Sequence, residues 1–134
     1  IYTKGAMVIH SLRGVLGDEL FFPALKAFAE AEQFTYLNLV TTQDFTDFIQ
    51  QFTGQNLEGF FELYLKTTRL PEVKVKKKGK NEFLVSLEGI DFEMPVEVKT
   101  STGIQKYSLG KTPVLISSTT TPEVDPRGWL MLQR

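Results

Sequence analysis

The chain has 134 residues, with 15 Lys and Arg, 16 Asp and Glu, one His and no Cys. This length fits one ordinary domain or two very small ones, and 42% apolar with 23% charged residues is typical of a folded protein. Intrinsic disorder is therefore disfavoured, and no run approaches the roughly 20 apolar residues of a membrane-spanning helix. A net charge of −1 argues against nucleic acid as the main partner.

Residues that carry chemistry are scarce. Zinc sites usually take three or four protein ligands, and a chain with one His and no Cys does not readily supply them. The lack of Cys also excludes disulfides. Neither Gly14 nor Gly17 belongs to a phosphate-binding loop, because no Gly-Lys-Ser/Thr sequence follows them. The composition therefore favours a non-enzyme or an incomplete enzyme.

Apolar residues recur at three- and four-residue spacing in the first half of the chain, as in amphipathic helices. We expect a first helix from Ala6 to Leu16, ended by Gly17. Asp18 can cap a second helix, and Pro23 would lie near its first turn, where a missing amide costs little.

Two further helices are predicted before Pro71. Thr41 and Asp44 form a capping signal for a helix ended by Gly54, and Asn56 can cap the next helix. Large apolar and aromatic side chains recur on one face of each of these two helices, which indicates that this face contacts a core. They are Phe45, Phe48, Ile49, Phe52, Phe60, Phe61, Tyr64 and Leu65.

The second half alternates with a period of two, as strands do. Turns are predicted at 78–81, 89–91 and 102–103, and a further short strand is expected at 114–116. Short strands at intervals of about ten residues indicate a small antiparallel β-sandwich.

Five lysines lie between Lys74 and Lys80. They can form a basic binding patch, for example for nucleic acid. A lysine-rich edge strand that is protected against further strand pairing explains them better.

The change of period at Leu70-Pro71 divides the chain. Residues 1–70 carry five basic and eight acidic side chains (net −3), and residues 71–134 carry ten and eight (net +2). We therefore expect an α+β fold, with a helical part in 1–70 and a small antiparallel β-sandwich domain in 71–134. Cores of this size need a tight shared interface, so the two parts should fold as one unit.

The chain opens with Tyr2-Thr3-Lys4-Gly5-Ala6, and Leu12-Arg13 and Leu16-Gly17-Asp18-Glu19 follow. These blocks resemble the Tyr-x-Lys-Gly-Ala and Leu-Arg-x-x-Leu-Gly-Asp-Glu of the aminopeptidase N family of zinc metallopeptidases, which are gluzincins. Near the end, Asp125-Pro126-Arg127-Gly128-Trp129 looks like that family's Asp-Pro-x-x-Trp closing strand. The resemblance thus runs along nearly the whole chain.

The resemblance implies an architecture. Residues 1–70 would be the C-terminal helical part of a thermolysin-like catalytic domain, and residues 71–134 the β-sandwich domain that follows it. The family's zinc-binding His-Glu-x-x-His is not in this chain. We therefore expect a fragment, with zinc bound in the full-length parent and no metal or cofactor ligand in the fragment itself.

Tyr2 is the one catalytic residue that the resemblance carries over. In the family, this tyrosine donates a hydrogen bond to the oxyanion formed when zinc-bound water attacks the scissile carbonyl. A phenol with a pKa of about 10 stays protonated at neutral pH and can donate where negative charge develops. The ordinary alternative is a half-buried tyrosine that opens a helix.

Two other side chains are expected to have structural roles. His10 has Gly14 four residues later and no second His, so we expect a packing residue rather than a metal ligand. Trp129 is expected to anchor the β-sandwich rather than to form a ligand platform.

The resemblance implies part of an aminopeptidase that hydrolyses amino-terminal residues from peptides with metal-activated water. Its partners would be a peptide substrate and the upstream part of the catalytic domain. The fragment alone should be inactive, and its bare apolar surface should cause self-association. The alternative is a non-catalytic interaction or adhesion module, or a degenerate peptidase. The compartment and the substrate preference do not follow from the sequence.

Overall fold

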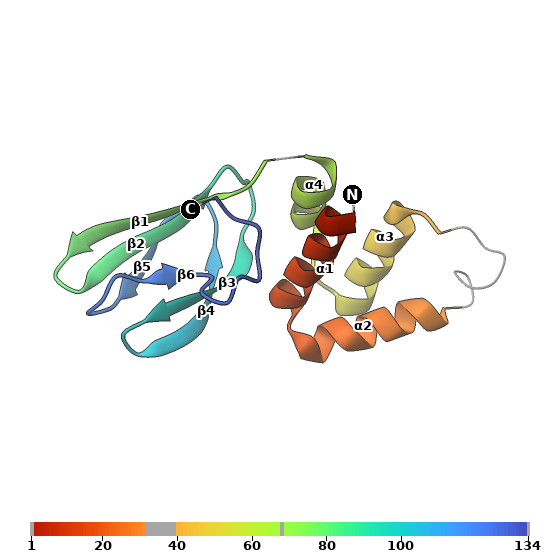
Figure 1. Cartoon of the computed structure of the whole chain (residues 1–134), viewed down its shortest axis with the longest axis horizontal. Helices are drawn as coiled ribbons and strands as arrows, with labels where there is room; N and C mark the ends of the chain where they lie inside the picture. The colour runs from red at the N-terminus through yellow and green to blue at the C-terminus, as the bar shows by residue number, and fades with distance from the viewer. Residues whose placement is uncertain (1, 32–39, 68, 134) are drawn as a thin grey trace.

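The computed structural model describes residues 2–31, 40–67 and 69–133, and of residues 2–5 it gives only the backbone. The described part has four helices, followed by two antiparallel sheets of three strands each, so the fold is α+β as predicted. Figure 1 shows the helices at one end of the molecule and the strands at the other. The elements are α1 (Tyr2–Leu16), α2 (Asp18–Glu30), α3 (Thr42–Thr53), α4 (Glu58–Lys66), β1 (Glu72–Gly79), β2 (Glu82–Glu88), β3 (Met94–Thr100), β4 (Gly103–Leu109), β5 (Val114–Ser117) and β6 (Glu123–Val124).

The turn between α1 and α2 confirms one prediction and corrects two. Gly17 ends α1 with a φ of 79°, a conformation that favours glycine, and its N–H donates to the Arg13 carbonyl at 2.8 Å. Asp18 does not cap α2: Gly17 takes the cap position, and the Asp18 carboxylate pairs with Arg13 at 2.6 Å. Pro23 lies in the second turn rather than the first, so α2 lacks the hydrogen bond that residue 23 would donate to Glu19.

The start of α3 has the predicted capping box. The Thr41 hydroxyl accepts from the Asp44 N–H, and the Asp44 carboxylate accepts from the Thr41 N–H, each at 3.0 Å. Gly54 closes the helix in the left-handed region, with a φ of 69°. At α4, the Asn56 side chain accepts from the Glu58 N–H at 3.1 Å, but the cap position itself is Leu57.

The strands form two sheets, in the orders β1-β2-β5 and β4-β3-β6. β1 lies at the edge of its sheet, which is the position predicted for the lysine-rich strand. The predicted closing strand at 125–129 is wrong. β6 ends at Val124, and Asp125 takes a φ of 51° that turns the chain instead of extending it.

One core runs through both parts of the chain. The buried apolar side chains of the helices and of both sheets belong to a single cluster. The two parts therefore share an interface, as their small size predicts, and its largest fully buried members include Leu12, Ile49, Phe60, Tyr64, Val85, Leu87, Val96, Val98, Leu109 and Ile116. None of the described helices is both long and apolar enough to cross a membrane.

Candidate functional site

The candidate catalytic residue, Tyr2, is the first residue of α1. Its backbone is helical, and the same holds for residues 3–5 of the opening motif. The side chains of these four residues lie outside the described part of the structure. The catalytic role of Tyr2 therefore remains a prediction.

An apolar groove of about 440 Å³ lies beside the first half of α1. It runs among all four helices and their connections, and three of its apolar residues, Ile9, Val40 and Leu65, are exposed. Exposed apolar side chains next to one another are a typical feature of a contact surface. The predicted self-association remains a prediction. The full lining is Val8, Ile9, Phe28, Val40, Thr41, Thr42, Phe45, Phe61 and Leu65.

A larger and more polar groove, of about 670 Å³, lies between α3 and α4. It contains the carboxylates of Asp47, Glu58 and Glu62. Asp47 accepts a hydrogen bond from Gln43 at 2.8 Å, and Glu62 pairs with Lys66 at 2.9 Å.

A metal site is absent from the part of the chain that the structure describes. There, no group of three or more His, Cys, Asp or Glu side chains is placed to hold a metal ion. The described residues thus do not fit a zinc centre.

His10 is a packing residue in this structure. Its ring stacks on Trp129, with centroids 4.8 Å apart and planes 23° from parallel. Its Nε2 atom lies 3.2 Å from the Gly128 carbonyl oxygen, to which a protonated Nε2 would donate. These contacts occupy both the face and one edge of the ring, as a packing role predicts.

Trp129 packs against the shared core and lies directly on α1, and its side chain also acts on Glu97 of β3. It therefore anchors the strands, as predicted, and it does so against the helix, which was not predicted. A Cβ atom on Gly14 would lie only 2.6 Å from the Trp129 Cβ, which shows how closely the helix and the segment of Trp129 approach each other. The Arg13 guanidinium lies 5.3 Å from the Trp129 ring centroid and 5.0 Å from that of Phe22. Trp129 therefore joins the chain end to the helix that begins at Tyr2.

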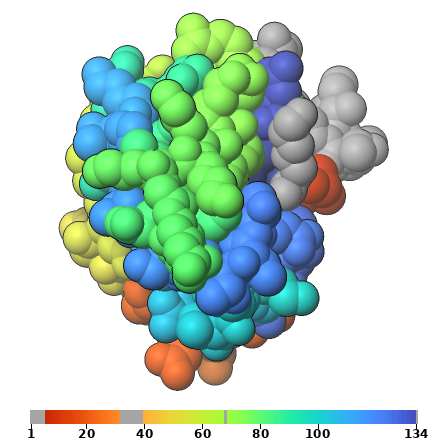
Figure 2. Space-filling view, turned by 90° about the vertical axis from the view of Figure 1, so that its left-hand side faces the viewer, coloured from red at the N-terminus to blue at the C-terminus, as the bar shows by residue number. Residues whose placement is uncertain are grey.

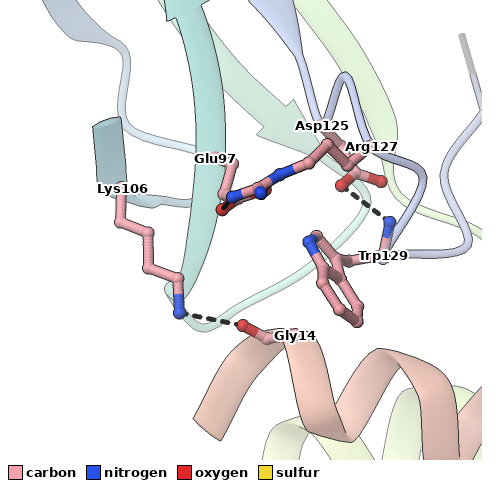
Figure 3. A network of polar contacts seen from close by, with 6 residues as sticks. All are labelled: Gly14, Glu97, Lys106, Asp125, Arg127 and Trp129. Atoms are coloured by element: carbon pink, nitrogen blue, oxygen red, sulfur yellow. Dashed lines mark hydrogen bonds and ion pairs between the residues drawn. The ribbon is translucent and has the colours of Figure 1, made fainter. Parts of the chain in front are cut away.

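A network of polar contacts holds this junction in place (Figure 3). Asp125, only 2% exposed, accepts hydrogen bonds from the N–H groups of Trp129 at 2.9 Å and Leu130 at 2.8 Å. Lys106 donates to the Gly14 carbonyl at 3.0 Å, in the last turn of α1, where a cation is favoured by the helix dipole. The β4-β3-β6 sheet is thus bonded directly to the C-terminal end of α1.

Glu97 is the nearly buried carboxylate of the network. Both of its oxygens accept from Arg127, one of them from Nε at 3.0 Å. The hydrogen bond from Arg127 lowers the pKa of Glu97. The positive charge of Arg127 and the side chain of Trp129 also lower this pKa, whereas burial of the carboxylate raises it. Glu97 is therefore ionised at neutral pH.

Tyr64 links α4 to the same C-terminal segment. Its hydroxyl donates to the Met131 carbonyl at 2.8 Å. Burial raises the pKa of Tyr64, and the charge of Asp125 adds to the effect. The phenol therefore stays protonated at neutral pH and acts as a donor inside the fold.

The roles of Glu97, Lys106 and Asp125 were not predicted from the sequence. A signal existed only for Asp125, because Asp-Pro followed by Gly128 is a turn signature. Glu97 and Lys106 lie on the paired strands β3 and β4, and only the tertiary packing brings Glu97 to Arg127 and Lys106 to the Gly14 carbonyl of α1.

One comparison with known proteins bears on function. The chain is 30% identical over 76 residues to aminopeptidase N of Lactococcus lactis subsp. lactis. The matched stretch is 57% of this chain and 9% of that protein, so the match spans less than a tenth of the length of that aminopeptidase. No family model matches. The similarity supports at most a distant relationship to an aminopeptidase.

Proposed function

We propose that this chain is part of a zinc-dependent aminopeptidase, an enzyme that releases amino-terminal residues from peptides. The observation that carries the proposal is the 30% identity over 76 residues to an aminopeptidase N. The opening Tyr-x-Lys-Gly-Ala block supports it. The zinc and its ligands would belong to a longer protein, since the described residues offer no such group.

Within that enzyme, Tyr2 would donate a hydrogen bond to the carbonyl oxygen of the scissile bond as negative charge develops on it. The phenol suits this role because it is a neutral donor at pH 7. The backbone of α1 begins at Tyr2.

In the same proposal, residues 1–70 complete the helical part of the catalytic domain, and residues 71–134 form a domain that supports it. The support would act on α1, through Lys106 on the Gly14 carbonyl and Trp129 on the helix surface. Because α1 is one continuous helix, contacts at its C-terminal end help to fix the direction in which Tyr2 is presented.

An assay of peptide hydrolysis tests the proposal. A longer protein that contains this chain and an upstream zinc site should release amino-terminal residues, lose that activity to a zinc chelator and regain it with added zinc. The 134-residue chain alone should show no turnover. A longer protein that binds zinc but releases no residue would favour the alternative of a degenerate peptidase or an interaction module.

A further inference from the structure

The lysines between Lys74 and Lys80 give the protein an uneven distribution of charge. The segment 74–82 contains five lysines and one glutamate (net +4), and the rest of the chain carries ten basic and fifteen acidic side chains (net −5). The positive charge is thus concentrated in the β1–β2 hairpin. Charge that is separated in this way orients a protein toward an anionic partner.

The lysines of the hairpin are accessible, and most of them are not neutralised. All five are exposed. Lys74 pairs with Glu72 at 2.9 Å, whereas the other four take part in no ion pair with a described residue. Figure 2 looks at the strand end of the molecule, and the green β1–β2 hairpin stands at the front of the surface. Figure 1 shows that this end lies away from the helices, and so from the proposed catalytic position.

The lysines surround the end of the hairpin instead of converging on one point. Because consecutive strand residues point to opposite faces, the side chains of Lys76 and Lys77 leave the sheet in opposite directions. Lys78 lies at the irregularity near the end of β1, and Lys80 lies in the turn. Protection of a strand edge explains lysines within the strand but not Lys80 beyond it. Charges spread in this way suit a broad anionic surface better than a pocket for a single anion.

An exposed leucine lies on the same face of the sheet as Lys76. The register places Lys76 opposite Leu84 on β2, and Leu84 opposite Leu115 on β5. This face is opposite to the one that buries Val85, and Leu115 is 48% exposed on it. A basic and an apolar side chain therefore share one row of the exposed face. The surface of a lipid bilayer offers a partner to both, because charged head groups lie beside the ends of the acyl chains.

These side chains do not need a free strand edge. Gln133 pairs with Glu72, at the end of β1 farthest from the turn. Side chains stand perpendicular to the plane in which strands pair, so a further strand beside β1 would leave Lys76 and Leu115 accessible.

We propose that the β1–β2 hairpin, together with the face that carries Lys76 and Leu115, docks on an anionic lipid bilayer. The lysine ammonium groups would lie among the negatively charged head groups, and Leu115 would enter the boundary with the acyl chains. Each lysine near such a surface contributes about fivefold to binding. The strand end would face the bilayer, and the helical end would point away from it.

Sedimentation with lipid vesicles measures this binding for the 134-residue chain. The chain should bind vesicles of phosphatidylcholine with one third phosphatidylserine, should not bind phosphatidylcholine alone, and should be released by added salt. Lys76→Gln combined with Lys78→Gln should weaken binding about 25-fold, and Lys26→Gln on the exposed surface of α2 should leave it unchanged. Leu115→Thr should weaken binding severalfold, whereas Ile104→Thr, at a similarly exposed position on β4, should not. Circular dichroism would verify that each variant is folded.

Absence of binding, or equal binding to neutral vesicles, would overturn the proposal. Unchanged binding of the double lysine variant or of Leu115→Thr would overturn it as well. Tighter binding of an acidic polypeptide or of a single-stranded oligonucleotide at the same lysines would make that polymer the partner instead of the bilayer. A longer protein that contains this chain should bind the same vesicles, and its failure to do so would also contradict the proposal. None of these results depends on the proposed peptidase activity.

Discussion

Glu97 shows how a single carboxylate can connect the strands to the chain end. It lies on β3, is 9% exposed, and holds Arg127 through both of its oxygens. The backbone carbonyl of the same residue accepts from the Asp125 N–H at 2.7 Å. Glu97 therefore contacts the turn that carries Trp129 through its side chain and its main chain.

The stability of the protein should fall in acid partly because of Glu97. The hydrogen bond from Arg127 holds the pKa of Glu97 below its ordinary value of 4.5. A carboxylate with a lowered pKa stabilises the folded state above its ordinary pKa, and that contribution is lost as the pH falls through the lowered value. Urea unfolding at a series of pH values should show a steeper loss below about pH 4.5 for the wild type than for Glu97→Gln.

Glu123→Gln is the matched control, since Glu123 is exposed on the neighbouring strand β6. Its acid profile should follow that of the wild type. If the profile of Glu97→Gln runs parallel to that of the wild type, the Arg127 contact does not contribute to stability in the way described.

At the scale of elements, the decisive contact is between α1 and the segment that follows β6. Glycine at position 14 lets the Trp129 side chain lie against the helix backbone. Alanine favours helix formation by about 1 kcal/mol over glycine, so Gly14→Ala would stabilise a helix that had nothing packed against this position. Here the packing and the helix propensity act in opposite directions.

We expect Gly14→Ala to lower the free energy of unfolding by about 1–3 kcal/mol, because the new Cβ would lie 2.6 Å from the Trp129 Cβ and force it to move. In a Trp129→Gly background, the same change should stabilise the protein, because the opposing side chain is gone. Chemical denaturation of the four proteins of this cycle measures the difference. An equal effect of Gly14→Ala in both backgrounds would show that the close approach has no energetic importance.

The ends of elements were predictable where the signal is local. The capping box of Thr41 and Asp44 needs only residues three apart, and Gly17 and Gly54 adopt the conformations that end helices. Pro23 is the sixth residue of α2, because the helix begins at Asp18 directly after Gly17. A start at Glu19 would still make it the fifth residue, beyond the four whose N–H groups have no partner in the helix, so the loss of its N–H is not free at either position.

At the scale of the whole molecule, the arrangement of the helices against the sheets was not predictable from the sequence. Period and turn signals located the change from helices to strands, because they act between near neighbours. Trp129 and Gly14 are 115 positions apart in the sequence, and neither has a local feature that points to the other. For the same reason, the sequence does not predict the contact of Trp129 with α1.

Because one core includes residues of both parts, the protein should unfold in a single transition. Circular dichroism follows the helices, and the fluorescence of Trp129, the only tryptophan, follows the junction. The two unfolding curves should coincide in midpoint and slope. Two separate transitions would mean that residues 1–70 and 71–134 fold independently despite their shared core.

The central claim is that Tyr2 stabilises the developing charge in an aminopeptidase. The most direct measurement is kcat for release of an amino-terminal residue by a longer, zinc-containing protein with Tyr2 and with Tyr2→Phe. We expect Tyr2→Phe to lower kcat by about 10²–10³ without changing the zinc content. Tyr107→Phe, which removes a hydroxyl from a tyrosine on β4, should leave kcat unchanged. An unchanged kcat for Tyr2→Phe would contradict the claim.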